Sequence, residues 1–388
     1  MKTALPPLPL PQGIRARHVD TGTGLSMHVL QAGFESPGRP VVLLLHGFPE
    51  LAWSWRKVML PLAQAGYRVI APDQRGYGRT TGWDDRYDGD LASFDLLNLV
   101  RDQVGLLRAL GLRSVAAVVG HDFGSPVAAW CALVRPDVFP AVVLMSAPFD
   151  GVPELPFGTA DAPPAPRPAS PDVHAALAAL PRPRKHYQWY YSTREADGDM
   201  RHCPQGLHAF LRAYYHVKSA DWPDNRPHPL GAWSAEQLAI LPTYYVMDLD
   251  QDMAQTVAPH MPTPEQVAAC RWLPEDELRV YSQEFGRTGF QGGLQWYRCR
   301  TQPTPGVGLS LFSGRSIDVP AMFVAGASDW GVYQKPGAFE AMQGRGCTRM
   351  TSAHLVPGAG HWVQQEQPEQ VNSLLLNFLQ RATDEIRG

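Results

Sequence analysis

Residues 115–125 read VAAVVGHDFGS and carry the strongest structural signal in the sequence. An apolar run leads into GHDFG at residues 120–124, and a helical pattern begins directly afterwards. This order predicts a buried strand that turns sharply into a helix. Such a turn crowds its neighbours and holds its central residue at unfavourable φ and ψ, so glycine is needed on both sides of it. The central residue here is Asp122.

Asp122 is a candidate nucleophile. A carboxylate is already ionised near neutral pH, so it needs no base before it attacks carbon and forms an ester on the enzyme. An aspartate in this place can also do no more than cap the helix that starts near Ser125. The complete arrangement of strand, flanking glycines and helix favours the nucleophile over the simple cap.

The first 150 residues alternate short apolar runs with helical patterns. Runs typical of buried strands lie at residues 41–45, 67–73, 114–119 and 141–145. Helix-period patterns lie between or after them at residues 54–66, 91–111 and 125–134. This order predicts a parallel sheet that is covered by helices on both faces.

The alternation then stops and resumes near the C-terminus. Residues 151–171 are rich in proline and alanine, which is typical of an exposed connection. The following segment is rich in aromatic residues and helical patterns and has no clear strands, until strands are predicted again at 321–326 and 352–356 and a helix at 368–382. We therefore expect a core of residues 1–150 and 318–388, interrupted by a helical insertion at 151–317.

The composition excludes several classes of protein. The 388 residues carry a formal net charge of -3, which does not indicate a nucleic-acid partner or an acidic membrane surface. Five scattered cysteines suggest neither a disulfide scaffold nor a metal site, and none of the 13 histidines has a zinc-motif spacing. We expect a cytoplasmic protein, because prolines interrupt the N-terminal apolar run and no run is long enough for a membrane span. We also expect a monomer or homodimer.

The motif HGFPE at residues 46–50 follows the first apolar strand. A loop in this place can aim the backbone N–H of Phe48 at the nucleophile turn, where the N–H of Phe123 would be its partner. Two such donors form an oxyanion hole for the intermediate of ester hydrolysis. The alternative is an ordinary turn that uses glycine and proline at the end of a strand.

Asp329 and His361 follow the last two predicted strands. Both therefore belong to the carboxyl edge of the sheet, where open α/β sheets build their sites. A neutral imidazole can take a proton from water, and a carboxylate can fix its tautomer. A single histidine after a strand is usually a packing residue, but the order nucleophile, acid, histidine favours a catalytic pair. No serine stands in a Gly-x-Ser-x-Gly pattern, which weighs against a serine esterase.

Six stretches together carry a resemblance to a known family: HGFPE (46–50), WSWR (53–56), DQRGYG (73–78), GHDFGS (120–125), SAPF (146–149) and GAGHW (358–362). With them the sequence resembles the epoxide hydrolases of the α/β-hydrolase superfamily, from about Gly13 to the C-terminus. The resemblance implies an α/β-hydrolase fold, a mostly parallel sheet with the insertion as a helical cap. It also implies hydrolysis of a small-molecule epoxide by water, without a metal or organic cofactor.

Tyr187, in HYQWYY, and Tyr297, in GGLQWYR, look like the two cap tyrosines of that family. The resemblance implies that their phenols hydrogen-bond the epoxide oxygen and donate a proton, since a phenol is protonated at neutral pH yet more acidic than an alcohol. The alternative for each is an aromatic side chain that only packs on the core. Tyr190 and Tyr191 are close neighbours, and the YQ context favours Tyr187.

Two features depart from the pattern of the family. Phe123 stands where many relatives have tryptophan, and the cap is longer than in the smaller members. We expect the substrate to contact side chains around the nucleophile and in the cap: His46, Pro49, Trp53, Phe149, Trp189, Trp296, Trp330 and Trp362. Two rival functions are a dehalogenase, which uses the same nucleophile but needs N–H donors for a halide, and a non-catalytic binding protein with the same fold.

Overall fold

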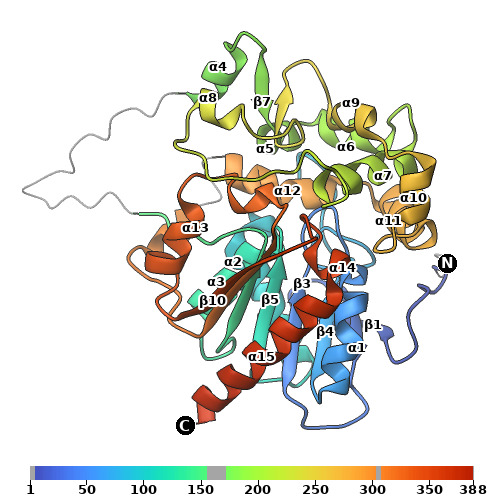
Figure 1. The fold of residues 1–388 in the computed structure, drawn as a ribbon. Coiled ribbons are helices and arrows are strands. Elements are labelled where there is room, and N and C mark those ends of the chain that lie inside the picture. The colour runs from blue at the N-terminus through green and yellow to red at the C-terminus, as the bar shows by residue number, and fades with distance from the viewer. Residues whose placement is uncertain (1–4, 155–171, 303–306, 388) are drawn as a thin grey trace, which may run out of the picture.

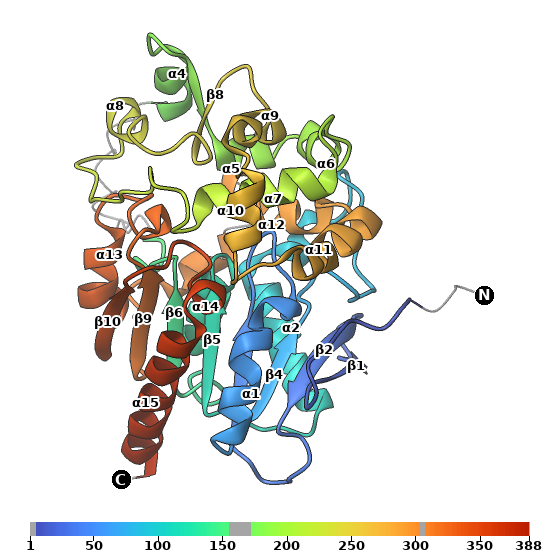
Figure 2. The ribbon, with the colours of Figure 1, turned by 45° about the vertical axis from the view of Figure 1, so that its right-hand side comes forward.

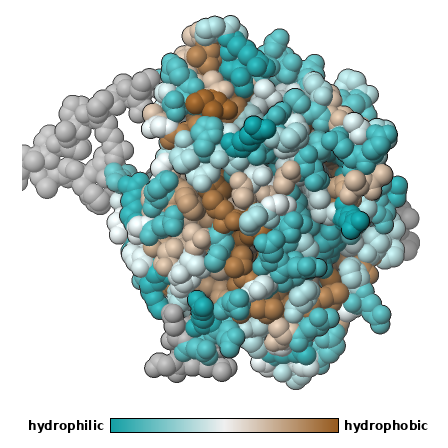
Figure 3. All heavy atoms as spheres, in the orientation of Figure 1, coloured by the Kyte–Doolittle hydropathy of each residue, from teal (hydrophilic) through white to brown (hydrophobic). Residues whose placement is uncertain are grey.

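The computed structural model describes residues 5–154, 172–302 and 307–387 (Figure 1). Most of the connection expected at residues 151–171 lies outside this range. Within the described residues, no helix is both long and apolar enough to cross a membrane. The face drawn in Figure 3 is mostly hydrophilic, with apolar residues in smaller patches. This is the usual surface of a chain that buries its apolar side chains.

An eight-stranded sheet forms the centre of the described chain, in the order β1-β2-β4-β3-β5-β6-β9-β10. The bounds are β1 Arg15–Asp20, β2 Ser26–Ala32, β3 Val41–Leu45, β4 Arg68–Pro72, β5 Ala117–His121, β6 Val142–Met145, β9 Ala321–Gly326 and β10 Met350–Val356. β1 and β2 pair antiparallel, as do β2 and β4, and all other neighbours are parallel. The predicted, mostly parallel sheet is therefore confirmed.

Helices cover both faces of the sheet (Figures 1 and 2). On one face lie α1 Arg56–Gln64 and α15 Pro368–Arg387, and on the other lie α2 Leu96–Ala109 and α3 Gly124–Val134. Strand β3 shows why its sequence is apolar throughout. Leu43 and Leu45 belong to the apolar cluster on one face, whereas Val42 and Leu44 belong to the cluster on the other. A strand buried on both faces has no polar alternation.

The insertion forms a cap over one end of the sheet (Figures 1 and 2). Its helices are α4 Val173–Ala178, α5 Tyr187–Tyr191, α6 Glu195–Arg201, α7 Leu207–Lys218, α8 Ala235–Leu238, α9 Met253–Val257, α10 Pro264–Ala269, α11 Glu275–Thr288 and α12 Gln291–Thr301. The expectation of no clear strands in this segment was wrong, because β7 Arg184–His186 and β8 Val246–Asp248 pair antiparallel. Strands of three residues are too short to show a period of two in the sequence.

The helix predicted over residues 91–111 is divided. A short 3₁₀ helix, η2 Leu91–Phe94, precedes α2, and Asp95 lies between them in an extended conformation. The carboxylate of Asp95 accepts from the backbone N–H of Asn98, so it caps the N-terminus of α2. The apolar periodicity continues across this break, which is why the sequence pattern alone missed it. In the same way, the predicted helix at 54–66 begins as the 3₁₀ helix η1 Ala52–Trp55 before α1.

Asp73 fixes the strand ends near the site. The residue is 3% exposed, and its carboxylate accepts from His28 Nδ1 at 2.8 Å, from the backbone N–H of Arg79 at 3.0 Å and from that of Ala52 at 2.9 Å. Burial by itself raises the pKa of Asp73, but His28 and the other donors outweigh burial and lower the pKa from 3.8 to about 2.

This lowered pKa predicts a pH-dependent contribution to stability. The stabilisation from Asp73 is present above about pH 4 and is lost as the pH falls towards about 2, because a protonated carboxyl loses these partners. Asp73→Asn should lower the free energy of unfolding at neutral pH by on the order of 2 kcal/mol and flatten its decrease in acid. Urea unfolding between pH 5 and pH 2.5 measures both effects. Equal acid slopes for the two proteins would contradict the assignment.

Candidate active site

The turn between β5 and α3 holds Asp122 in a strained conformation. Its φ is 50°, in the left-handed region that few residues other than glycine adopt. A Cβ on Gly120 would lie 2.0 Å from the carbonyl oxygen of Gly124, and a Cβ on Gly124 would lie 2.3 Å from that of Leu45. A Cβ on Gly47 would lie 2.4 Å from Asp122. Three close approaches therefore explain why the pattern needs glycine at these positions.

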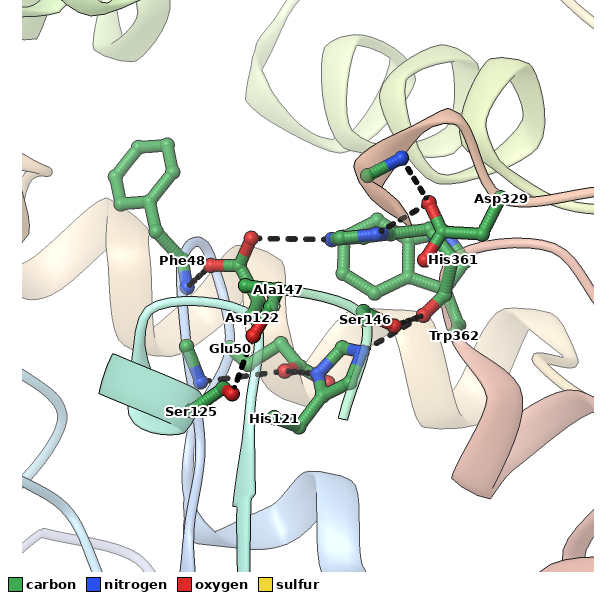
Figure 4. Close-up of polar contacts among 12 residues, drawn as sticks. Phe48, Glu50, His121, Asp122, Ser125, Ser146, Ala147, Asp329, His361 and Trp362 are labelled. Carbon is green, nitrogen blue, oxygen red and sulfur yellow. Dashed lines mark hydrogen bonds and ion pairs between the residues drawn. The ribbon is translucent and has the colours of Figure 1, made fainter. Parts of the chain in front are cut away.

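The two oxygens of Asp122 have different neighbours (Figure 4). Oδ1 accepts a hydrogen bond of 2.8 Å from the backbone N–H of Phe48. Oδ2 lies 3.2 Å from Nε2 of His361. The backbone nitrogen of Phe123 also lies close to the Gly47 loop, because a Cβ on Gly47 would come within 2.7 Å of it. The structure thus brings Phe48, Phe123 and His361 around one carboxylate.

Asp329 and His361 lie on loops that follow β9 and β10, as the sequence predicted. Nδ1 of His361 faces Oδ1 of Asp329 at 3.1 Å, and both side chains are almost fully buried. Asp329 also accepts from the backbone N–H of Gly331 at 2.7 Å. Burial raises the pKa of Asp329, but His361 outweighs burial and lowers it, so the carboxylate is ionised and orients the imidazole.

Asp122 is ionised although it is buried. Burial by itself raises its pKa, whereas the neighbouring His361, then Lys218 and His121, lower it to well below the usual range. An ionised carboxylate with one oxygen held by an N–H and the other beside an imidazole is a competent nucleophile that needs no activating base.

A second buried pair, Glu50 with His121, supports the histidine loop and was missed in the sequence. Nδ1 of His121 lies 2.6 Å from Oε2 of Glu50, and Nε2 lies 2.7 Å from the carbonyl oxygen of His361. Burial lowers the pKa of His121, but the Glu50 carboxylate outweighs burial and raises it. With both ring nitrogens facing acceptors, His121 is a cation. Glu50 lies in the HGFPE motif and His121 in the GHDFGS motif, so these two motifs were the sequence signal that could have pointed to the pair.

Glu366 joins the histidine loop to the cap. Its carboxylate accepts from the backbone N–H groups of Gly360 at 2.9 Å, Trp362 at 2.9 Å and Ala220 at 2.8 Å. Gly360 and Trp362 flank His361, whereas Ala220 follows the last turn of α7. One carboxylate therefore fixes the position of the histidine relative to the cap.

The two predicted cap tyrosines lie together above the nucleophile turn. The ring of Tyr297 packs edge-on against Phe48 at 5.5 Å and Phe123 at 5.2 Å, and Tyr187 lies 5.9 Å from Tyr297. The hydroxyl of Tyr187 donates to Oε1 of Gln334 at 3.0 Å, whereas that of Tyr297 has no hydrogen-bond partner among the described residues. Burial raises the pKa of both phenols and the charge of Asp122 raises it further, so both are protonated.

The neighbouring tyrosines use their hydroxyls elsewhere. Tyr190 donates to Asp199 at 3.1 Å, and Tyr191 donates to the hydroxyl of Tyr214 at 3.0 Å. The hydroxyl of Tyr187 is engaged as well, with Gln334 and Gln188, so the choice of Tyr187 over its neighbours is still a prediction.

Three of the residues expected to contact substrate use their polar atoms within the fold. His46 is fully buried and contacts the main chain through both ring nitrogens. Trp296 donates its indole N–H to the carbonyl of Arg75 at 3.0 Å, and Trp362 donates to that of Tyr215 at 2.8 Å. Only the ring surfaces of these tryptophans remain for contact with a substrate.

The other expected contact residues are spread around the core and cap. Pro49, Trp53 and Trp330 are buried, and Trp189 packs against His174 with ring centroids 3.7 Å apart. The contact between Trp189 and His174 does not involve Asp122, Tyr187 or Tyr297. Contact of these four expected residues with a substrate is still a prediction.

Phe149 lines a cavity of 1140 Å³ together with Phe123 and Trp296. Asp122 and His361 are not among the described residues that line it. The cavity therefore adjoins the site through the Phe123 ring and does not contain the nucleophile. Among the described residues, no group of three or more histidine, cysteine, aspartate or glutamate side chains is placed to hold a metal ion.

The parallel sheet, the strained turn and the chain order of Asp122, Asp329 and His361 define an α/β-hydrolase architecture. A profile of the alpha/beta hydrolase fold matches residues 40–368. Epoxide hydrolase B of Mycobacterium tuberculosis is 33% identical over 376 residues, which cover 92% of this chain and 96% of that protein. Epoxide hydrolase A of the same organism is 33% identical over 370 residues, covering 94% and 96%.

Solved structures agree with the sequence relatives. An epoxide hydrolase from an endophytic Streptomyces superimposes with a TM-score of 0.75 at 30% identity, covering 96% of this chain and 97% of that one. Epoxide hydrolase I of potato, Solanum tuberosum, superimposes with a TM-score of 0.70 at 29% identity, covering 95% and 99%. The chain therefore belongs to the alpha/beta hydrolase fold family, within its epoxide hydrolase branch.

Proposed function

We propose that this protein hydrolyses epoxides to vicinal diols through a covalent ester on Asp122. The observation that carries the proposal is the environment of the Asp122 carboxylate. One oxygen is held by the Phe48 N–H at 2.8 Å, and the other lies 3.2 Å from Nε2 of His361. This arrangement suits two steps on one carboxylate, attack on carbon followed by hydrolysis of the resulting ester.

In the first step Oδ2 of Asp122 attacks an epoxide carbon. The C–O bond of the ring breaks, and Tyr187 or Tyr297 gives its phenolic proton to the oxygen that leaves the carbon. A hydroxyalkyl ester remains on Asp122, with Oδ1 as its carbonyl oxygen. Low acidity of both buried phenols keeps them protonated until the ring oxygen becomes strongly basic.

In the second step His361 takes a proton from water, which attacks Cγ of the Asp122 ester. The negative charge develops on Oδ1, which already faces the Phe48 N–H, and the Phe123 N–H would be the second donor. Asp329 stabilises the imidazolium of His361. As the intermediate collapses, the leaving alkoxide takes the proton from His361 and the diol is released. The second proton of the water passes from the Asp122 carboxyl group to the tyrosinate, which restores the Asp122 carboxylate and the phenol.

The test is diol formation from a panel of neutral epoxides, such as styrene oxide, phenyl glycidyl ether and 1,2-epoxyhexane. We expect the wild type to convert at least one of them to its diol. A folded wild type that produces no diol from any of them, but releases halide from haloalkanes, would favour a dehalogenase. That rival has less support here, because the side chains of Phe48 and Phe123 offer no N–H to a halide.

Replacing the cap tyrosines should slow ring opening. We expect Tyr187→Phe and Tyr297→Phe each to lower the alkylation rate about 10- to 100-fold, since two phenols share the acid role. Stopped-flow tryptophan fluorescence under single-turnover conditions separates alkylation from ester hydrolysis. Tyr190→Phe is the matched control, because its hydroxyl donates to Asp199 and it should react like the wild type. Equal alkylation rates in all variants would remove the tyrosines from the mechanism.

A further inference from the structure

Lys218 is a buried cation inside a cage of aromatic rings. It is the last residue of α7, and its side chain is only 3% exposed. Its Nζ lies 5.0 Å from the ring centre of Tyr245, 5.2 Å from that of Tyr214, 5.5 Å from that of Trp362 and 6.0 Å from that of Tyr244. The faces of these rings stabilise the ammonium group but offer it no hydrogen-bond acceptor.

Two hydrogen-bond donors in this cage have no acceptor. An ammonium carries three N–H donors, yet within the described residues Nζ of Lys218 makes no hydrogen bond and no ion pair. The hydroxyl of Tyr245, whose ring is part of the cage, is buried and also has no hydrogen-bond partner. A buried hydroxyl without an acceptor is costly, and so is an ammonium group that is largely removed from water without an anionic partner. An anionic group with two oxygens would satisfy both.

The cage adjoins both halves of the catalytic machinery. The ring of Tyr245 lies 5.1 Å from that of Tyr187, and the ring of Trp362 lies 4.7 Å from that of His361. The carbonyl oxygen of Lys218 accepts from the backbone N–H of His361 at 2.8 Å. An acceptor bound by the cage would therefore be part of a molecule that also reaches the nucleophile.

We propose that Lys218 and Tyr245 bind a carboxylate on the epoxide substrate, so that the preferred substrates are epoxides with a carboxylate close to the ring. This inference rests on the proposed epoxide hydrolysis. The site would select among epoxides by the presence of this carboxylate. The aromatic walls also suit an aryl group between the carboxylate and the epoxide.

The charges around Lys218 change during the proposed reaction. Burial lowers the pKa of Lys218 and outweighs Asp122, then Asp329 and Glu50, which raise it, so the pKa lies below its usual value. Alkylation converts Asp122 into a neutral ester, so the ammonium loses the acidic neighbour that acts on it most strongly. A substrate carboxylate beside Nζ takes the place of that charge and keeps Lys218 protonated as the ester forms. Binding energy that grows along the reaction raises kcat as well as affinity.

The experiment compares matched substrates. One pair is 4-(oxiran-2-yl)benzoate and its methyl ester, and the other is 3-phenyloxirane-2-carboxylate and its methyl ester. The measured quantity is kcat/KM for diol formation, expressed as the ratio of carboxylate to ester. We expect the wild type to prefer the carboxylate in at least one pair. Lys218→Met, which keeps the length of the side chain, should lower that ratio about 10- to 100-fold.

Two further variants separate recognition from folding. Lys218→Arg keeps the charge and should retain most of the preference, whereas Tyr245→Phe removes one donor and should lower the ratio less than Lys218→Met does. Circular dichroism and the melting temperature establish that each variant is folded. A wild type that prefers both methyl esters, or an unchanged ratio in folded Lys218→Met and Tyr245→Phe, would overturn the proposal. If no epoxide of any kind is converted, the proposed reaction fails first and this inference falls with it.

Discussion

Asp122→Ala should lower diol formation by about 10⁴-fold or more, because the variant has no group that can form the ester. Water bound in place of the carboxylate cannot take over as the nucleophile, because it would first have to be deprotonated and oriented towards the epoxide carbon. Removing a nucleophile also removes the second step, because His361 then has no ester to hydrolyse. Gas chromatography measures the diol formed from the best epoxide of the panel.

The control for this variant is an acidic residue outside the site. Asp137 is exposed and pairs with Arg135 at 2.5 Å, so Asp137→Ala should keep the activity of the wild type. Asp122→Ala keeps a Cβ at a left-handed φ of 50°, so the fold of the variant must be established by circular dichroism before its activity is compared. Residual activity within about tenfold of the wild type in the folded variant would show that Asp122 is not the nucleophile.

His361→Gln should stop the reaction halfway. The amide has nearly the length of imidazole but cannot take a proton from water, so Asp122 still opens the epoxide and the ester then persists. We expect one equivalent of epoxide to be consumed and turnover to fall by about 10³-fold or more. Intact-protein mass spectrometry should show a mass increase equal to that of the epoxide.

The adduct must depend on the nucleophile. The double variant Asp122→Ala, His361→Gln should show no mass increase under the same conditions, which separates the ester from non-specific alkylation of cysteine or histidine. Full turnover by His361→Gln would mean that another group activates water. A folded His361→Gln that forms neither adduct nor diol would place His361 in ring opening and not in ester hydrolysis.

Most of the core could be predicted from the sequence, because its signals are local. An apolar strand, two flanking glycines and a helix specify the turn at Asp122, and β3 is apolar throughout because both faces are buried. The loops that carry Asp329 and His361 follow directly from the ends of β9 and β10. Each of these features depends on residues adjacent in the chain, so the pattern contains the information.

Other features depend on contacts between distant residues. Glu50 and His121 are 71 positions apart, and only the fold shows that they form a buried pair that supports the carbonyl of His361. Lys218 ends an amphipathic helix, where a lysine is ordinarily a solvated residue, and the cage appears only when α7 is placed against Trp362 and Tyr245. Short strands such as β7 and β8 exist because they pair with each other. The cytoplasmic location and the monomeric or dimeric state are still predictions.

In the proposed mechanism the oxygen added to the substrate comes from Asp122, and an oxygen from water replaces it on the enzyme. A single turnover in H₂¹⁸O, with wild-type enzyme in excess over epoxide, tests this directly by mass spectrometry of the diol and of the peptide that contains Asp122. We expect ¹⁸O in the Asp122 carboxylate and none in the first diol released. Label in the diol and none in the peptide would show that water attacks the epoxide directly and would contradict the covalent mechanism.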